Sequence, residues 1–194
     1  KWEALVTAAE QAGFQKEYIK EIGLAIQRED QSMYDRFRGR VIFPIFNVTG
    51  RAIGFGGRTL KTEKSVPKYV NSPESEIYHK SDVLYGLNLA KKAISDTDIC
   101  YLVEGYADVI SMHQAGVENV VSSSGTSLTS GQIRLLSRYT KNVTLLYDGD
   151  AAGIKASLRG TDMLLEEGLN VKVLLFPDGH DPDSYVQKFG SAHF

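Results

Sequence analysis

The chain has 194 residues, of which 42% are hydrophobic and 24% are charged, with a formal net charge of −2. This length suits one large domain or two small ones and allows a buried core. No apolar run approaches the roughly 20 residues that a membrane span needs, and the N-terminus lacks the layout of a signal peptide. Because only Cys100 is present, an internal disulfide and a cysteine-based zinc site within this chain are excluded. We expect a fragment, since the sequence starts at Lys1, and a reducing cytoplasmic location.

The small net charge conceals an uneven distribution of charge along the chain. Residues 36–80 contain nine Lys and Arg residues and three acidic residues, whereas residues 96–183 contain thirteen acidic residues and six Lys and Arg residues. Two solvated surfaces of opposite sign would explain this asymmetry. It would also suit a phosphate-binding surface beside a cation-binding site.

The first half of the sequence predicts a mixed α+β region. Residues 1 to about 33 are expected to be helical, because apolar side chains recur at helical spacing before Gly13. Residues 40–60 have the pattern of two strands with a turn at Thr49–Gly50, which predicts a hairpin. A polar loop is expected over residues 61–82 and a short helix over residues 83–93.

From Asp98 onwards, predicted strands and helices alternate with short connections. Strands are expected at 99–103, 119–122, 143–147 and 171–176, and helices at 106–115, 128–139 and 151–167. This alternation is typical of a parallel sheet covered by helices. We therefore predict an α/β fold: a basic α+β subdomain over residues 1–95, then a mainly parallel sheet flanked by helices over residues 96–194, where a further helical region also starts.

Acidic side chains follow three of the predicted strands at the points where the strands end. They are Glu104 after the first strand, Asp148 and Asp150 after the third, and Asp178, Asp181 and Asp183 after the fourth. Ligands bind beyond the carboxyl ends of the strands in open parallel sheets, so these carboxylates can meet in one crevice. Converging carboxylates repel one another unless a cation neutralises them, and hard oxygen ligands favour Mg²⁺ or Mn²⁺.

Each acidic residue also has a simpler explanation. Any of them could be a solvated surface residue, and Asp150 precedes a predicted helix, whose N-terminus it could cap. One acidic residue at a strand end is therefore weak evidence for a metal site. The presence of all three clusters at strand ends favours the metal site.

The acidic clusters lie in segments that resemble a known module. These segments are Leu102–Asp108, Ser124–Ser127 and Tyr147–Gly153, and together they resemble the Toprim module, which has a Glu after its first strand and an Asp-x-Asp after a later one. Toprim modules occur in primases, topoisomerases and some nucleases, and the acidic core alone does not separate these classes.

The flanking motifs separate them. They are Phe43–Ile45, Gly54–Arg58, Pro67–Tyr69, Asn71–Glu74, His79–Lys80, Leu84–Leu87 and Pro177–Asp183, and they resemble, in this order, bacterial DnaG-type primases. The resemblance runs from about Arg36 to Val186, whereas residues 1–35 match only loosely. It implies a Toprim-type fold for the second half of the chain.

The resemblance implies DNA-templated synthesis of short RNA primers for DNA replication, by metal-dependent nucleotidyl transfer from ribonucleoside triphosphates on single-stranded DNA. It makes Glu104, Asp148 and Asp150 the catalytic residues and the ligands of Mg²⁺ or Mn²⁺. Further candidates for metal binding are Asp108, Asp181 and Asp183, and candidates for nucleotide or nucleic-acid binding are Arg58, Lys68, Asn71 and Lys80. Asp108 could equally be a favourable charge in the first turn of a helix.

Family members also carry a zinc-ribbon domain and a C-terminal domain that binds the replicative helicase. We expect neither within this sequence, so we expect no zinc here, and we expect no membrane association. A fragment of a Toprim topoisomerase or nuclease, and a Toprim module that binds DNA without catalysis, are the alternatives. The sequence contains no P-loop, no dinucleotide fingerprint and no hydrolase nucleophile elbow.

Overall fold

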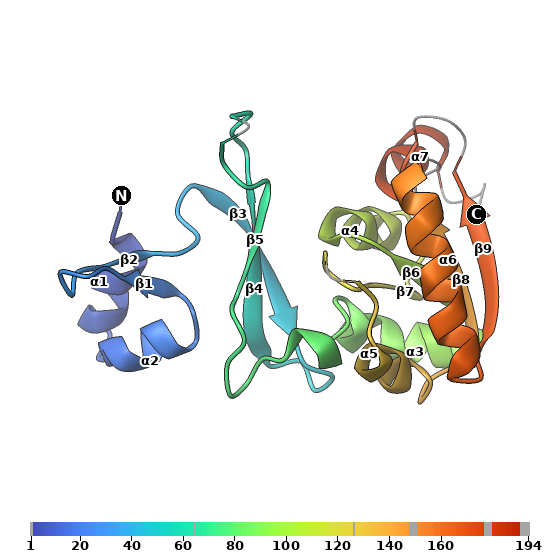
Figure 1. Ribbon diagram of the computed structural model, residues 1–194, viewed down its shortest axis with the longest axis horizontal. Helices are drawn as coiled ribbons and strands as arrows, with labels where there is room; N and C mark the ends of the chain where they lie inside the picture. The colour runs from blue at the N-terminus through green and yellow to red at the C-terminus, as the bar shows by residue number, and fades with distance from the viewer. Residues whose placement is uncertain (1, 64, 126, 148–150, 177–179, 191–194) are drawn as a thin grey trace. The chain divides into compact units, whose positions relative to one another are not determined.

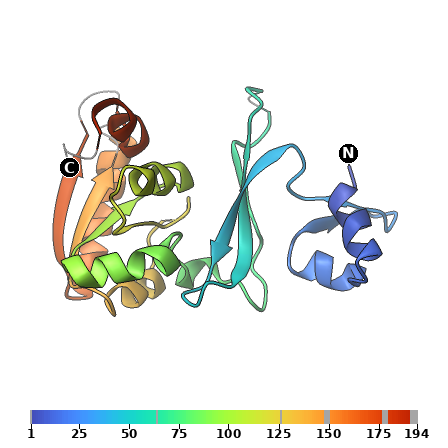
Figure 2. The ribbon, with the colours of Figure 1, turned by 180° about the vertical axis from the view of Figure 1, so that it is seen from behind.

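The structure is a computed structural model that describes residues 2–63, 65–125, 127–147, 151–176 and 180–190, without the side chains of residues 151 and 152. The chain forms two compact units, seen in Figures 1 and 2. The first unit comprises residues 1–46 and 51–79, and the second comprises residues 47–50 and 80–194. The boundary predicted between residues 95 and 96 falls inside helix α3 (Leu87–Thr97), whose apolar side chains belong to the core of the second unit.

The first unit begins with two short helices and a small hairpin. Its elements are α1 (Ala4–Gln11), α2 (Lys16–Glu21), β1 (Ala25–Gln27) and β2 (Met33–Asp35), with β1 and β2 antiparallel. The prediction of helix up to about residue 33 is therefore wrong beyond α2, where Gly23 adopts a φ of 72°. Buried Asp35 accepts hydrogen bonds from the backbone N–H groups of Leu5 (2.9 Å) and Val6 (3.1 Å), and so ties the hairpin to the first turn of α1.

A second, antiparallel sheet completes the first unit. It contains β3 (Arg40–Phe46), β4 (Ala52–Thr59) and β5 (Tyr69–Asn71), in the order β3-β4-β5. The hairpin predicted over residues 40–60 is confirmed, whereas β5 lies in the segment expected to be a loop. At Gly57 a Cβ atom would lie 2.7 Å from the Phe37 ring, so the glycine accommodates ring packing.

The second unit is an alternating α/β fold. After the 3₁₀ turn Lys80–Asp82 and α3, its elements are β6 (Cys100–Val103), α4 (Tyr106–Gln114), β7 (Val120–Ser122), α5 (Ser130–Leu136), β8 (Asn142–Tyr147), α6 (Ala151–Glu166), β9 (Asn170–Leu175) and α7 (Pro182–Phe189). The four strands are all parallel, in the order β7-β6-β8-β9, which confirms the predicted fold class. Helix α3 begins later than expected, because Gly86 at its N-cap has a φ of 84°.

Both faces of this sheet are covered, as Figures 1 and 2 show. Leu102 and Leu145 face a core that includes side chains of α3, α5 and α6, whereas Val103 and Leu146 face a second core that includes side chains of α4 and α7. Successive residues of a strand thus point into different cores, as the pleat requires. In the described ranges, every helix is too short or too polar to cross a membrane.

The chain leaves the two central strands in opposite directions. After β6 it enters α4 on one face of the sheet, and the helix that follows β8 is α6, on the other face. In an open parallel sheet, this reversal opens a crevice at the carboxyl ends of the two strands. The fold therefore places the ends of β6 and β8 at a natural ligand-binding position.

We predict that Leu145→Ala destabilises the protein by about 2–5 kcal/mol, because a large side chain is removed from a site with no solvent exposure. The matched control is Leu158→Ala on α6, where the side chain is 64% exposed and the expected change is below about 0.5 kcal/mol. Urea unfolding followed by far-UV circular dichroism measures both. Equal losses for the two variants would contradict this assignment of the core.

Candidate functional site

Glu104 lies at the crevice between the two central strands. The register pairs Leu102 with Leu145, so Glu104, which directly follows β6, is level with Tyr147 at the end of β8. Glu104 is exposed, and its carboxylate is a hard oxygen donor of the kind that Mg²⁺ and Mn²⁺ prefer. The described part of this edge therefore fits the chemistry of a divalent-cation site.

The other two carboxylates of the predicted site follow Tyr147 directly in the sequence. Asp148 and Asp150 lie outside the described residues, so their convergence with Glu104 stays a prediction. Within the described residues, no group of three or more His, Cys, Asp or Glu side chains is arranged to hold a metal ion. A complete site at this edge would therefore need carboxylates from the segment 148–150.

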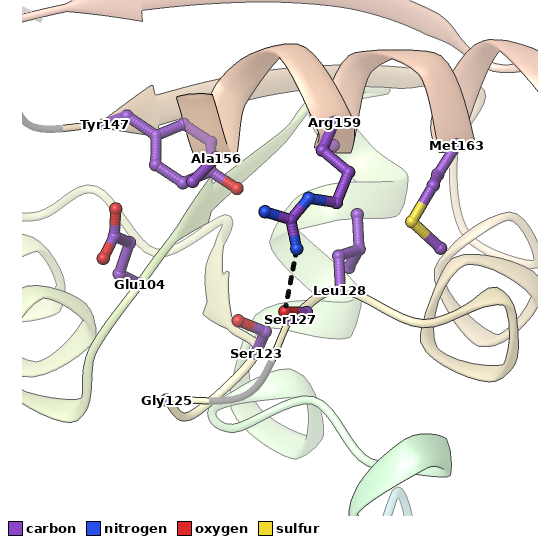
Figure 3. Close-up of a pocket in the computed structure, with 10 residues that line it drawn as sticks. Glu104, Ser123, Gly125, Ser127, Leu128, Tyr147, Ala156, Arg159 and Met163 are labelled. Carbon is purple, nitrogen blue, oxygen red and sulfur yellow. Dashed lines mark hydrogen bonds between the residues drawn. The ribbon is translucent and has the colours of Figure 1, made fainter. Parts of the chain in front are cut away.

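A cavity of about 250 Å³ opens beside Glu104. It is lined by Glu104, Ser123, Gly125, Ser127, Leu128, Tyr147, Ala156, Arg159, Gly160 and Met163. Figure 3 shows Glu104 and Tyr147 towards one end, Leu128 and Met163 towards the other, and the guanidinium of Arg159 between them. The cavity is therefore polar towards the strand ends and apolar at the end lined by Leu128 and Met163.

Tyr147 supplies a protonated hydroxyl group to this cavity. Burial raises its pKa to about 12, the negative charge of Glu104 adds to this rise, and the positive charge of Arg159 opposes it. The phenol therefore keeps its proton at neutral pH. It can donate a hydrogen bond to an anion in the cavity.

Asp108 closes the first turn of α4. Its Oδ2 atom accepts a hydrogen bond from the backbone N–H of Gly105 at 2.9 Å, which ties the residue after Glu104 to the helix. A Cβ atom at position 105 would lie 3.0 Å from that oxygen. Asp108 therefore stabilises the N-terminus of α4, which is one of the two roles that the sequence suggested. Its other suggested role, metal binding, stays a prediction.

Asp181 and Asp183 stabilise α7. Asp181 is the N-cap residue and accepts from the backbone N–H of Ser184 at 2.7 Å, while Asp183 accepts from the hydroxyl of Ser111 on α4 and from the amide of Gln187. Burial acts to raise the pKa of Asp181, but hydrogen bonds from Ser184 and its own backbone N–H, together with His180, lower that pKa overall. Asp178 lies outside the described residues, and the metal-binding role of Asp181 and Asp183 stays a prediction.

Three of the four residues predicted to bind nucleotide or nucleic acid lie on the first unit. Arg58 and Lys68 line one cavity of about 620 Å³, and Asn71 ends β5, which pairs with the strand that carries Arg58. Arg58 also lies over the Tyr69 ring, with 6.0 Å between its guanidinium carbon and the ring centroid. This grouping of positive charge suits a phosphate ligand.

Lys80 belongs to the second unit. Its carbonyl accepts a hydrogen bond from the buried amide of Gln132 at 3.0 Å, and the same amide also donates to the carbonyl of Val83 at 2.9 Å. Gln132 on α5 therefore fixes the backbone of the 3₁₀ turn from which the Lys80 side chain projects.

The first unit has a further basic cavity that the sequence-based site did not include. This cavity of about 410 Å³ is lined by Trp2, Arg36, Arg38, Gly39, Arg40, Thr59, Lys61 and Val66. The guanidinium carbon of Arg38 lies 4.1 Å from the centroid of the Trp2 ring. The arginines at positions 36, 38 and 40 were the signal in the sequence that could have indicated this cavity. The contact of Arg38 with Trp2 could not be predicted, because the two residues are far apart in the sequence.

Two family models match the chain. The model described as the DNA primase catalytic core, N-terminal domain, matches residues 1–91, and the Toprim-like model matches residues 101–186. The DNA primase of Clostridium acetobutylicum is 49% identical over the whole chain, which covers 32% of that primase. A Staphylococcus aureus DNA primase is 44% identical over 94% of the chain, which covers 30% of that primase.

Solved structures of primases also match the chain. The primase of Aquifex aeolicus, with its zinc-binding and RNA polymerase domains, superposes with a TM-score of 0.92 and 40% identity over 98% of this chain and 47% of that one. A DnaG primase catalytic domain bound to single-stranded DNA gives a TM-score of 0.88 and 39% identity over 100% of this chain and 63% of that one. The parallel sheet of the second unit lies in the part of the chain that the Toprim-like model matches.

The chain belongs to the DnaG-type DNA primases and corresponds to part of their catalytic core. It spans about a third of the length of the curated primases that it matches. The family resemblance inferred from the sequence motifs is thereby confirmed.

We predict that Asp181→Ala lowers the free energy of unfolding by about 1 kcal/mol at pH 7, because α7 loses its N-cap. The folded-state pKa of Asp181 is lowered, so its charge stabilises the fold above the unfolded pKa of about 3.9, and this stabilisation is lost as the pH falls through the folded pKa. The difference between the variant and the wild type should therefore shrink in acid.

Asp181→Asn is the matched control, because asparagine also caps helices well but carries no charge. The free energy of unfolding of Asp181→Asn should be close to that of the wild type at pH 7. It should not show the loss of stability in acid that comes from protonation of Asp181. Urea unfolding between pH 7 and about pH 2.5 measures both variants. If Asp181→Ala lowers the free energy of unfolding by the same amount at every pH, the charge of Asp181 does not stabilise the fold.

Proposed function

We propose that this chain forms part of the catalytic core of a bacterial cytoplasmic primase that synthesises short RNA primers on a single-stranded DNA template from ribonucleoside triphosphates. The observation that carries the proposal is the cavity beside Glu104 at the crevice of a Toprim sheet, in a chain that matches DNA primases over its whole length. The specific enzyme class is a DNA-directed RNA polymerase of the primase type.

The chemistry is nucleotidyl transfer. The 3′-hydroxyl oxygen of the primer forms a bond to the α-phosphorus of the nucleoside triphosphate. The bond from that phosphorus to the oxygen that bridges the α- and β-phosphates breaks, and pyrophosphate leaves with the electron pair. The hydroxyl proton passes to water. Glu104, Asp148 and Asp150 would hold Mg²⁺, or Mn²⁺ in its place, with Asp108, Asp181 and Asp183 as further candidates. When bound, the metal would offset the negative charge that develops on the attacking and leaving oxygens.

The protein's own contribution is positioning and charge. Tyr147 presents a protonated hydroxyl beside Glu104, and the cavities lined by Arg58, Lys68 and Arg38 gather positive charge on the first unit. A DnaG catalytic domain has been solved bound to single-stranded DNA, and a Mycobacterium tuberculosis primase domain has been solved with double-stranded DNA. We propose the basic cavities, with Asn71 and Lys80, as contacts for template, RNA primer and nucleotide phosphates. The replicative helicase would bind elsewhere in a longer protein.

The test of the proposal is incorporation of labelled ribonucleotides on single-stranded DNA, with Mg²⁺ or Mn²⁺ and a chelator control, by a full-length primase that contains this chain. Asp148→Asn and Asp150→Asn should each lower incorporation by roughly hundredfold or more, because loss of one charge-stabilising group costs about that much in rate. Both variants should also bind Mn²⁺ more weakly in titration calorimetry.

Binding of single-stranded DNA should stay close to wild type in these variants, since removing a carboxylate takes away no attraction for phosphate. A folded double variant that binds Mn²⁺ as the wild type does would disprove the metal assignment. A wild type that binds DNA but incorporates no ribonucleotide would favour a DNA-binding Toprim module.

Lys68→Ala should weaken binding of single-stranded DNA and flatten its salt dependence, because each neutralised phosphate contributes about 0.7 to the log–log slope. The matched control is Lys16→Ala in the same unit, where the lysine is exposed and paired with Glu10 at 2.9 Å. Fluorescence anisotropy of a labelled strand over a salt series measures affinity and slope. An unchanged slope for Lys68→Ala would leave Lys68 as ordinary solvated surface.

A further inference from the structure

Among the described residues that line the cavity beside Glu104, Arg159 is the only lysine or arginine. It lies on α6, and Figure 3 shows its guanidinium reaching into the cavity between Tyr147 and Leu128. In the part of the chain that the structure describes, its one hydrogen bond is a long one, 3.4 Å to the hydroxyl of Ser127. A guanidinium has five N–H donors, so most of its capacity is available to a ligand.

The charge of Arg159 also lacks a carboxylate partner within the described residues, and Arg134 on α5 provides the contrast. Arg134 forms an ion pair with Glu167 at 3.7 Å and lies away from the cavity. Arg159 forms no such pair there, although it is close enough to Tyr147 to oppose the rise of its pKa. A guanidinium in a partly apolar cavity, paired with no carboxylate, is suited to an anionic ligand.

The position of Arg159 along α6 restricts the size of that anion. Helix α6 begins at Ala151, directly after the segment that carries Asp148 and Asp150. Arg159 is eight residues further on, which is about 12 Å along a helix axis, and helical side chains tilt back towards the N-terminus. Figure 3 shows the guanidinium between the Glu104 end and the apolar end of the cavity, and this separation from Glu104 suits an anion of several linked phosphates.

We propose that Arg159 binds a phosphate group of the nucleoside triphosphate, while other phosphate oxygens of the same molecule face the Glu104 end of the cavity. The hydroxyls of Ser127 and Tyr147 are additional donors beside the guanidinium. The inference rests on the proposed function, because it assigns a nucleotide subsite to the same cavity. A planar guanidinium with parallel N–H donors binds phosphate with two hydrogen bonds, whereas lysine supplies a point charge.

The cavity favours a nucleotide over a nucleic-acid backbone. A bound strand needs several cations in a row to neutralise successive phosphates, and the cavities of the first unit have such sets, for example Arg58, Lys61 and Lys68. The cavity of the second unit has one cation and a volume of about 250 Å³. It also has an apolar end, lined by Leu128 and Met163, that offers a strand backbone nothing to bind.

The experiment measures binding of ATP in the presence of Mn²⁺ by titration calorimetry, using the full chain. Arg159→Ala should weaken ATP binding roughly ten- to hundredfold, the range expected for loss of hydrogen bonds to a charged group. Arg159→Lys should recover part of this loss. The matched control Arg134→Ala should bind ATP as the wild type does, and all variants should keep wild-type affinity for single-stranded DNA.

Circular dichroism on each variant separates binding from folding, and Arg159→Gln replaces Arg159→Ala if the alanine variant unfolds. Wild-type ATP affinity in a folded Arg159 variant overturns the proposal, as does a wild type that binds no ATP with Mn²⁺. Equal losses of ATP and DNA affinity also overturn it, because they would indicate a strand contact. If ribonucleotide incorporation by the wild type is intact while Arg159→Ala binds ATP normally, this subsite is wrong and the proposed function stands. If ATP binding depends on Arg159 but the wild type incorporates no ribonucleotide, the nucleotide subsite is supported and the proposed function is wrong.

Discussion

The parallel pairing of β6 with β8 is the constraint on which the rest of this structure depends. Because the chain turns to α4 after β6 and the helix after β8 lies on the other face, the carboxyl ends of the two strands are left open between helices. Alternate residues of both strands are held in two different cores, so a shift by one residue would exchange their environments. The pairing of the two strands therefore fixes the level of Glu104 relative to Tyr147.

This arrangement makes the lining of the crevice change from polar at the strand ends to apolar further along. The strand ends supply the carboxylate of Glu104 and the protonated hydroxyl of Tyr147, and α6 adds the guanidinium of Arg159 before the lining becomes apolar at Met163. Charges against a partly apolar wall interact more strongly than charges in water. A carboxylate and a guanidinium in the same small cavity are what the proposed binding of a metal-bound polyphosphate requires.

The alternation of strands and helices from Cys100 onwards was predictable, because most of these elements are long enough to show their period and the three-residue β7 lies between two predicted helices. Strands β1 and β5 were not, since three residues cannot establish alternation and their pairing partners determine them. The position of Glu104 followed from the strand that precedes it. Arg159 was missed, because on an amphipathic helix an arginine that lines a cavity has the same sequence pattern as one in solvent.

The hydrogen bonds of the acidic residues indicate which of them are the better candidates for metal ligands. Asp108 and Asp181 accept backbone N–H groups at the first turns of α4 and α7, and such hydrogen bonds stabilise the ionised form without a metal. These hydrogen bonds hold both side chains at the helix ends. Glu104 follows a strand and caps no helix. Because Mg²⁺ keeps several waters and takes phosphate oxygens as further ligands, Glu104 with Asp148 and Asp150 would suffice. We therefore propose Glu104, Asp148 and Asp150 as the main ligands, and keep Asp108 and Asp181, which orient the turns around the proposed site, as further candidates.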